Sequence, residues 1–235
     1  MTAPADRAAI DPVVVGARLA EIRARITAAG GDPARVKIVA VTKTFGPPAV
    51  RAALACGIVD LGENYARELL STAAAVAGDG PAPRWHFLGS IQRRDVAKLA
   101  PVVSFYEGVD RVEEGVAIAR HAPGATVYVE LDASRIPGRG GVPAAGAATL
   151  IASLRALDLA VGGVMTIAPP GDPAGAEAAF ALARRVADDH GLLECSMGMS
   201  DDLELAVAAG STAVRIGRAL FGARERGPRS VTMES

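Results

Sequence analysis

The residue best placed to take part in chemistry is Lys43, which follows an apolar, β-branched run at residues 36–41. Such a run predicts a buried strand, and the carboxyl end of a strand is where α/β proteins present functional side chains. A partly desolvated amine has a lowered pKa and can form a Schiff base with an aldehyde. The alternative is a surface lysine whose side chain extends into water. This stretch alone leaves both interpretations open.

A second chemical signal lies near the end of the chain, in two loops that contain glycine. Residues 195–200 read Cys-Ser-Met-Gly-Met-Ser, and residues 214–218 read Val-Arg-Ile-Gly-Arg. Each loop leads into an expected helix, where free backbone amides and the helix dipole favour an anion. Gly198 and Gly217 let the backbone approach a ligand closely. The pattern predicts a phosphate site, although Ser200 is also an ordinary helix N-cap residue.

Other residues near the strand ends carry weaker functional signals. Asn64 follows the second expected strand. His86 lies within an apolar strand between two aromatic residues, where a core histidine is commoner than a catalytic one. Met165 and Met199 are expected to line a cavity rather than to act as ligands. No group of histidines and cysteines has the spacing of a metal site, so no metal is predicted.

The elements that must position these residues alternate between strand and helix. Eight such units predict a parallel sheet, and eight is the number that a closed (β/α)8 barrel needs. An open doubly wound sheet is the alternative, but no G-x-G-x-x-G follows the first strand. The seven strands expected after the Lys43 strand are residues 58–61, 85–88, 102–106, 126–131, 161–165, 192–195 and 212–216.

A single domain is expected to hold the whole chain. A helix over residues 11–29, capped by Asp11, precedes the barrel at residues 36–222. A polar tail follows at residues 223–235 and is expected to fray. No shift in composition marks a second domain.

The composition of the chain argues against nucleic acid and membranes as partners. The chain has 25 basic and 26 acidic residues and a net charge of −1, so it has no field that attracts nucleic acid or a membrane. Cys56 and Cys195 do not form a disulfide framework. No apolar run is long enough to span a membrane or resembles a signal peptide, and a cytoplasmic location is expected.

Several segments resemble one known family, the pyridoxal phosphate homeostasis proteins. The resemblance extends from about residue 36 to residue 222. Its most specific motifs are residues 196–201 and 210–217. It implies the alanine-racemase-like barrel of the fold-type III pyridoxal phosphate proteins, without the β-domain of true alanine racemases. The other matching segments are residues 42–43, 62–65, 86–89 and 163–166.

The resemblance implies pyridoxal 5′-phosphate (PLP) as the cofactor, joined covalently to Lys43. Arg215 would face the pyridine ring and keep its nitrogen unprotonated, because the arginine charge is permanent. A ring in that state is a weaker electron sink for carbanions. The implied phosphate loops contain Ser196, Gly198, Met199, Ser200 and Gly217, and the remaining expected cofactor neighbours are Asn64, His86 and Met165.

Two loops depart from the pattern of the family. Arg94 and Asp95 stand where the family usually has Asn and Lys, and residues 134–141 lack the usual Gly-Glu and Lys-x-Gly. These departures leave the lysine and the phosphate loops intact. They put a partner or lid role of the two loops in doubt.

The function that the resemblance implies is to carry or buffer PLP in vitamin B6 homeostasis, without firm catalytic activity. Client enzymes that use PLP are the expected partners, and the chain is expected to be a monomer or a weak homodimer. A racemase-type enzyme is the alternative, and it needs a second acid/base on the opposite face of the cofactor. None of Tyr65, Tyr106 and Tyr128 lies in a segment that matches the tyrosine of alanine racemases. A third interpretation is a barrel that binds another phosphorylated metabolite, with Lys43 unbonded.

Overall fold

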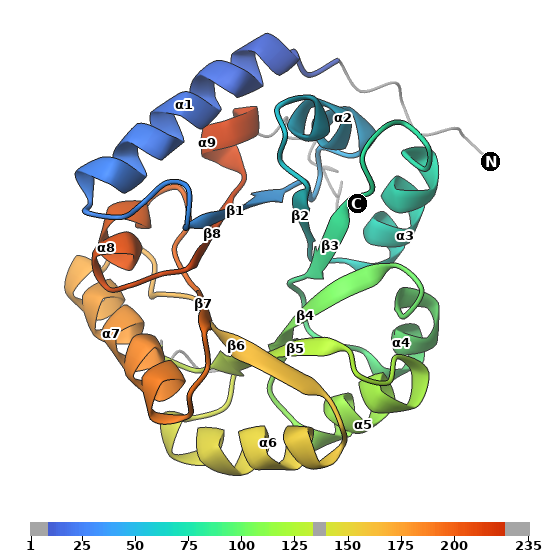
Figure 1. Ribbon diagram of the computed structural model, residues 1–235, viewed down its shortest axis with the longest axis vertical. Coiled ribbons are helices and arrows are strands. Elements are labelled where there is room, and N and C mark those ends of the chain that lie inside the picture. The colour runs from blue at the N-terminus through green and yellow to red at the C-terminus, as the bar shows by residue number, and fades with distance from the viewer. Residues whose placement is uncertain (1–8, 134–139, 224–235) are drawn as a thin grey trace, which may run out of the picture.

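The computed structural model describes residues 9–133 and 140–223, which form a closed barrel of eight parallel strands (Figure 1). Each strand pairs with the next along the chain, and β8 closes the barrel against β1. The predicted (β/α)8 fold is confirmed, so all the strands direct their carboxyl ends to one mouth. The strands are β1 (Lys37–Val41), β2 (Asp60–Glu63), β3 (Arg84–Phe87), β4 (Val103–Val109), β5 (Thr126–Leu131), β6 (Ala160–Thr166), β7 (Glu194–Ser196) and β8 (Ala213–Ile216).

Helices surround the barrel and bury an apolar face against it (Figure 1). In α7, Phe180 and Ala183 are fully buried, whereas Arg184 pairs with Asp188 across one turn at 2.8 Å. No helix in the described ranges is long and apolar enough to cross a membrane. The helices are α1 (Pro12–Ala28), α2 (Pro47–Ala55), α3 (Ala66–Ala75), α4 (Arg93–Leu99), α5 (Val112–His121), α6 (Ala144–Ala156), α7 (Pro173–Asp189), α8 (Leu203–Ala208) and α9 (Arg218–Phe221).

The first helix, α1, is additional to the eight strand–helix units and lies across the outside of α8 and α9 (Figure 1). It begins where predicted, because the Asp11 side chain accepts a hydrogen bond from the Val13 amide at 2.8 Å. Its buried stripe is Val15, Leu19, Ile22 and Ile26, which recur at helical spacing. The helix therefore packs beside the elements that follow β7 and β8.

Three strands differ from their predicted bounds by two residues or more. The prediction ended β4 at Tyr106 because Glu107 interrupts the apolar run. The strand continues to Val109, and Glu107 is completely buried within it. β2 begins at Asp60 rather than at residue 58. β7 begins at Glu194, which leaves Leu193 84% exposed. The predicted frayed tail falls outside the described residues from residue 224 onward, and most of the unusual loop at residues 134–141 also lies outside them.

The interior of the barrel carries charged side chains. Glu107 on β4 bonds to Ser196 on β7, and these two strands are not neighbours, so the contact crosses the inside of the barrel. Asp60, His86 and Arg215 are also at most 6% exposed. Barrel interiors are usually filled by branched apolar residues. This interior departs from that pattern, with charged side chains that extend from Asp60, the first residue of β2, to Arg215 in β8.

Candidate functional site

A cavity at the carboxyl ends of the strands brings Lys43 together with the loops after β7 and β8. Its volume is about 120 Å³, smaller than the roughly 300–1,000 Å³ of typical ligand sites. Long side chains line it, among them those of Lys43, Met199 and Arg218. The cavity is lined by Val41, Lys43, Asn64, Leu88, Met165, Ile167, Met199, Ser200, Asp201, Arg215, Gly217 and Arg218.

The turn after β1 fixes the position of Lys43. Thr42 is fully buried, its amide donates to the Gly62 carbonyl at 3.0 Å, and its hydroxyl donates to Glu63 at 2.7 Å. Thr44 has a φ of 69°, a left-handed conformation that turns the chain sharply. Lys43 is thus held between an anchored residue and a tight turn, with its partly buried side chain in the cavity.

Glu63 lies beside this turn but is not among the residues that line the cavity. Burial raises the pKa of Glu63 to about 7, and the hydrogen bond from Thr42 and the positive charge of Lys43 oppose that rise. Its second carboxylate oxygen is buried and has no hydrogen-bond partner among the described residues. Protonation of that oxygen would remove an unpaired buried charge.

The loops after β7 and β8 are tied to each other and to α1. The Ser200 hydroxyl accepts a hydrogen bond from the Ala219 amide of α9 at 3.2 Å. The Arg25 side chain of α1 donates to the Ser200 carbonyl at 2.9 Å and also pairs with Glu204. Ser200 thus does not begin its own helix, whose N-cap is Asp202. These contacts hold the backbone of the loop against the start of α9.

Gly198 is required by the geometry of the loop. Its φ is +93°, and a Cβ atom there would lie 2.4 Å from the Cβ of Ala206. At Gly217 a Cβ would lie 3.3 Å from the Val41 carbonyl oxygen, next to the strand that carries Lys43. Both glycines thus allow close backbone packing around the cavity.

Arg215 supplies a buried cation to the cavity. Its guanidinium donates to the Ser196 carbonyl and hydroxyl at 2.6 and 2.9 Å and to the Thr166 carbonyl at 2.7 Å. Burial lowers the pKa of Arg215, while the carboxylates of Glu107 and Glu130 oppose that effect. An arginine keeps its proton in proteins, so a fixed positive charge faces the cavity.

His86, Ser196 and Gly198 do not line the cavity, unlike the other predicted site residues. His86 lies deeper in the barrel between Glu107 and Asp60, at 2.5 and 3.0 Å. Ser196 donates its hydroxyl hydrogen to Glu107 at 2.5 Å. Sequence reasoning identified neither Glu107 nor Asp60; the only signal for them was a carboxylate placed beside or within an apolar run.

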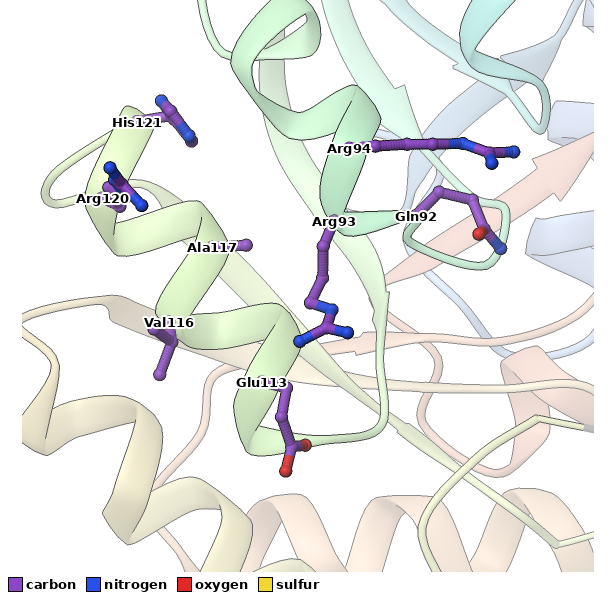
Figure 2. A pocket seen from close by; sticks show the side chains of 8 residues that line it. All are labelled: Gln92, Arg93, Arg94, Glu113, Val116, Ala117, Arg120 and His121. Carbon is purple, nitrogen blue, oxygen red and sulfur yellow. The ribbon is translucent and has the colours of Figure 1, made fainter.

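A larger groove lies elsewhere, between α4 and α5. Its volume is about 640 Å³, and Figure 2 shows Arg93 projecting from the start of α4 into the space between the two helices. It is also lined by Val116, Ala117, Arg94, Arg120 and His121. None of these groups is a buried nucleophile, so the groove lacks the chemistry that the Lys43 cavity has.

Cys195 adjoins the loop after β7 but is inert. It is fully buried, and burial raises the pKa of its thiol to about 12. Cys195 and Cys56 are both free thiols. The described residues contain no cluster of three or more histidine, cysteine or carboxylate side chains that could hold a metal ion.

Comparison with known proteins places the chain in a family. Residues 17–225 match the alanine racemase N-terminal domain. A protein of Pseudomonas aeruginosa named pyridoxal phosphate homeostasis protein is 39% identical over 216 residues, covering 88% of this chain and 93% of the relative. This chain belongs to the pyridoxal phosphate homeostasis protein family. A member from Deinococcus radiodurans is 38% identical over 88% of this chain and 99% of its own length.

Solved structures agree with this family assignment. PipY of Synechococcus elongatus without PLP superposes with a TM-score of 0.80 at 31% identity, covering 88% of this chain and all of PipY. PipY with PLP bound gives a TM-score of 0.77 at 30% identity over the same shares. The lysine decarboxylase of Selenomonas ruminantium, at 16% identity and a TM-score of 0.65, shares the fold alone, over 89% of this chain and 60% of that protein. The alanine-racemase-like, fold-type III barrel is thus established.

The residues around the cavity fit PLP. The amine of Lys43 suits an aldehyde, and the Arg215 guanidinium suits a pyridine nitrogen. The loop at Ser200 and the start of α9 at Gly217 suit a phosphate. Asn64 adds a specific observation. Its side-chain oxygen is buried and lacks a partner among the described residues, so it can accept a hydrogen bond from a ligand.

Proposed function

We propose that this protein binds PLP at Lys43 and carries or buffers it within the cell, as part of PLP homeostasis. The observation that carries the proposal is the single cavity in which the Lys43 amine, the Arg215 cation and the loops at Ser200 and Gly217 meet. The names of the relatives and the PLP bound to PipY support the same function.

Each end of the cavity has its own task in this proposal. When bound, PLP supplies an aldehyde that a lysine amine can attack and a ring that draws electron density. Lys43 supplies that amine, and the turn around Thr42 holds it at the mouth of the barrel. The loop at Ser200, the start of α9 and Gly217 would hold the phosphate through backbone amides. Arg215 would lie beside the pyridine ring, where its permanent charge would keep the ring nitrogen unprotonated.

The tyrosines favour a carrier over a racemase. Tyr106 and Tyr128 are at most 1% exposed and do not line the cavity, and burial raises the pKa of Tyr106 to about 12. Tyr65 is 59% exposed and does not line the cavity either. This chain therefore brings no tyrosine of its described part to the face of the cavity where a second acid/base would act. A solvent-deuterium exchange assay at the α-carbon of an amino acid tests this: turnover at an ordinary enzymatic rate would favour the racemase.

Partners and assembly form the remaining part of the proposal. We infer that enzymes which use PLP are the clients, because a reversible lysine bond can be exchanged for another amine. The chain would act as a monomer or a weak homodimer, and its two free cysteines suit the reducing cytoplasm.

Covalent trapping tests the attachment site sharply, because the chain has only three lysines: Lys37, Lys43 and Lys98. Purified protein is incubated with PLP, reduced with borohydride, digested and mapped by mass. The proposal predicts an adduct on the peptide that contains Lys43. Lys43→Ala should lose the adduct while its loops retain some cofactor, and the matched surface change Lys98→Ala should keep the adduct. An adduct that persists in Lys43→Ala, or that maps to Lys37 or Lys98, would exclude Lys43. A metabolite bound only through its phosphate would leave no adduct at all.

A further inference from the structure

A line of alternating charges runs through the interior of the barrel and ends at the candidate site. Arg84 pairs with Asp60 at 2.5 Å, and Asp60 contacts the Nε2 atom of His86 at 3.0 Å. The Nδ1 atom of His86 contacts one oxygen of Glu107 at 2.5 Å. The second oxygen of Glu107 accepts from the Ser196 hydroxyl at 2.5 Å, and that hydroxyl accepts from Arg215 at 2.9 Å. Only Arg215, the last member, lines the cavity.

The two carboxylates determine the charge state of His86. Both ring nitrogens face a carboxylate oxygen, so both must carry hydrogen for the two contacts to be hydrogen bonds. Burial opposes a charged ring, but the hydrogen bonds to Asp60 and Glu107 outweigh burial, and the pKa of His86 is raised. Burial likewise opposes the Glu107 anion, yet His86, Arg215 and Ser196 together hold the pKa of Glu107 below its usual value.

An anionic Glu107 dictates the direction of the Ser196 hydroxyl. A carboxylate can only accept, so Ser196 donates its single hydrogen to Glu107. The lone pairs of Ser196 are then left for the Arg215 guanidinium. The Ser196 and Thr166 carbonyls take further donors of Arg215, at 2.6 and 2.7 Å. The orientation of Arg215 is therefore linked to the charge on Glu107, whose carboxylate opposes the effect of burial on the pKa of Arg215.

We propose that Glu107 is a positioning residue of the cofactor site, which acts through Ser196 to fix the Arg215 guanidinium, and that His86 holds Glu107 in place. The inference rests on the proposed function, since Arg215 has a ligand to position only if PLP binds here. It assigns His86 and Ser196 to the layer beneath the cavity. It also adds Glu107 and Asp60, which had no assigned role, to the apparatus of the site.

Glu107→Gln tests the proposal, because it keeps the shape of the side chain and removes the charge. Glu114→Gln is the matched control: Glu114 is 2% exposed and bonded to Arg111 and to the Asp110 amide, but it lies on α5 away from the cavity. Glu107→Gln should shift the absorbance spectrum of bound PLP and weaken its affinity by about tenfold, a loss typical of a hydrogen bond to a charged group. Glu114→Gln should leave the spectrum and the affinity unchanged.

A double mutant distinguishes a positioning role of Glu107 from a merely structural one. In an Arg215→Lys background, Glu107→Gln should produce no further spectral shift, because residues that act through one another are not additive. If Glu107→Gln does not fold, Ser196→Ala removes only the hydroxyl that connects Glu107 to Arg215, and it should give the same spectral shift. A folded Glu107→Gln or Ser196→Ala protein with the wild-type spectrum and affinity would overturn the proposal, as would an equal effect of Glu114→Gln.

A measurement without cofactor keeps this inference distinct from the proposed function. In the cofactor-free protein, hydrogen exchange of the Arg215 guanidinium, followed by NMR, should be faster in Glu107→Gln than in the wild type. If the wild-type protein fails to bind PLP, the proposed function fails. If the wild type binds PLP, and Glu107→Gln changes neither the exchange rate nor the spectrum, only the positioning role fails.

Discussion

Replacing His86 with leucine should destabilise the protein strongly, because two buried carboxylates lose their shared partner. Glu107 would keep only the Ser196 hydroxyl at 2.5 Å, whereas Asp60 would still pair with Arg84. Arg84 is half exposed, so solvent weakens that remaining pair. Removing one partner from a buried ion pair costs about 3–5 kcal/mol. Leucine retains the apolar packing on Phe105, whose ring stacks on His86 at 4.3 Å, so the loss is mainly electrostatic.

Thermal or urea unfolding, followed by circular dichroism, measures this loss. The expected destabilisation lowers the unfolding midpoint by about 6–20 °C for a chain of this size. The matched control is His121→Leu, at an exposed histidine at the end of α5, which should change stability by about 0.5 kcal/mol or less. A His86→Leu protein destabilised by less than about 1 kcal/mol would refute the reasoning, since the carboxylates would then not depend on the imidazolium.

The destabilisation should depend on pH in a defined direction. The pKa of Glu107 is depressed in the folded protein, so its stabilisation is present above the ordinary carboxyl pKa and is lost as the pH falls through the folded value. The pKa of His86 is raised, so its stabilisation is present below the ordinary imidazole pKa and is lost as the pH rises through the folded value. The difference between wild type and His86→Leu should be largest between these limits and should shrink on both sides. A difference that is flat across this range would contradict the assigned charges.

Three further changes test the loops and the cation. Gly198→Ala should destabilise the protein by about 1–3 kcal/mol in urea unfolding, because its φ is positive and its Cβ would meet Ala206; unchanged stability would contradict the described loop. Arg25→Ala should weaken PLP binding several-fold in a fluorescence titration, because it removes the hydrogen bond to the Ser200 carbonyl. A PLP affinity equal to that of the wild type would show that α1 does not support the site. Arg215→Glu should alter the spectrum or the retention of bound PLP, and no change in either would remove Arg215 from the site.

The fold and the mouth of the barrel were predictable because they follow from local patterns. A β-branched run predicts β1, so Lys43 was expected at its carboxyl end. The loop around Gly198 was expected because short sequence motifs mark it. Both signals lie within a few consecutive residues, and the barrel then brings them together, since all eight strands point the same way.

The layer beneath the mouth could not be predicted in the same way. Glu107 and Asp60 are carboxylates within buried strands. Apolar periodicity ended the predicted strand just before Glu107, and it placed Asp60 within the strand at residues 58–61 without indicating its partners. Their burial depends on partners contributed by β3, β7 and β8, whose positions only the closed barrel defines. For the same reason, Ser196 was expected to face the phosphate, whereas its side chain points to Glu107.

A crystal structure of the PLP-loaded protein tests the central claim most directly. The account predicts density for one PLP in the Lys43 cavity, continuous with the Lys43 Nζ atom. The phosphate should lie against the Ser200 and Gly217 loops, and the ring nitrogen should face Arg215. PLP bound in the groove between α4 and α5, or held with its phosphate away from Ser200 and Gly217, would contradict it.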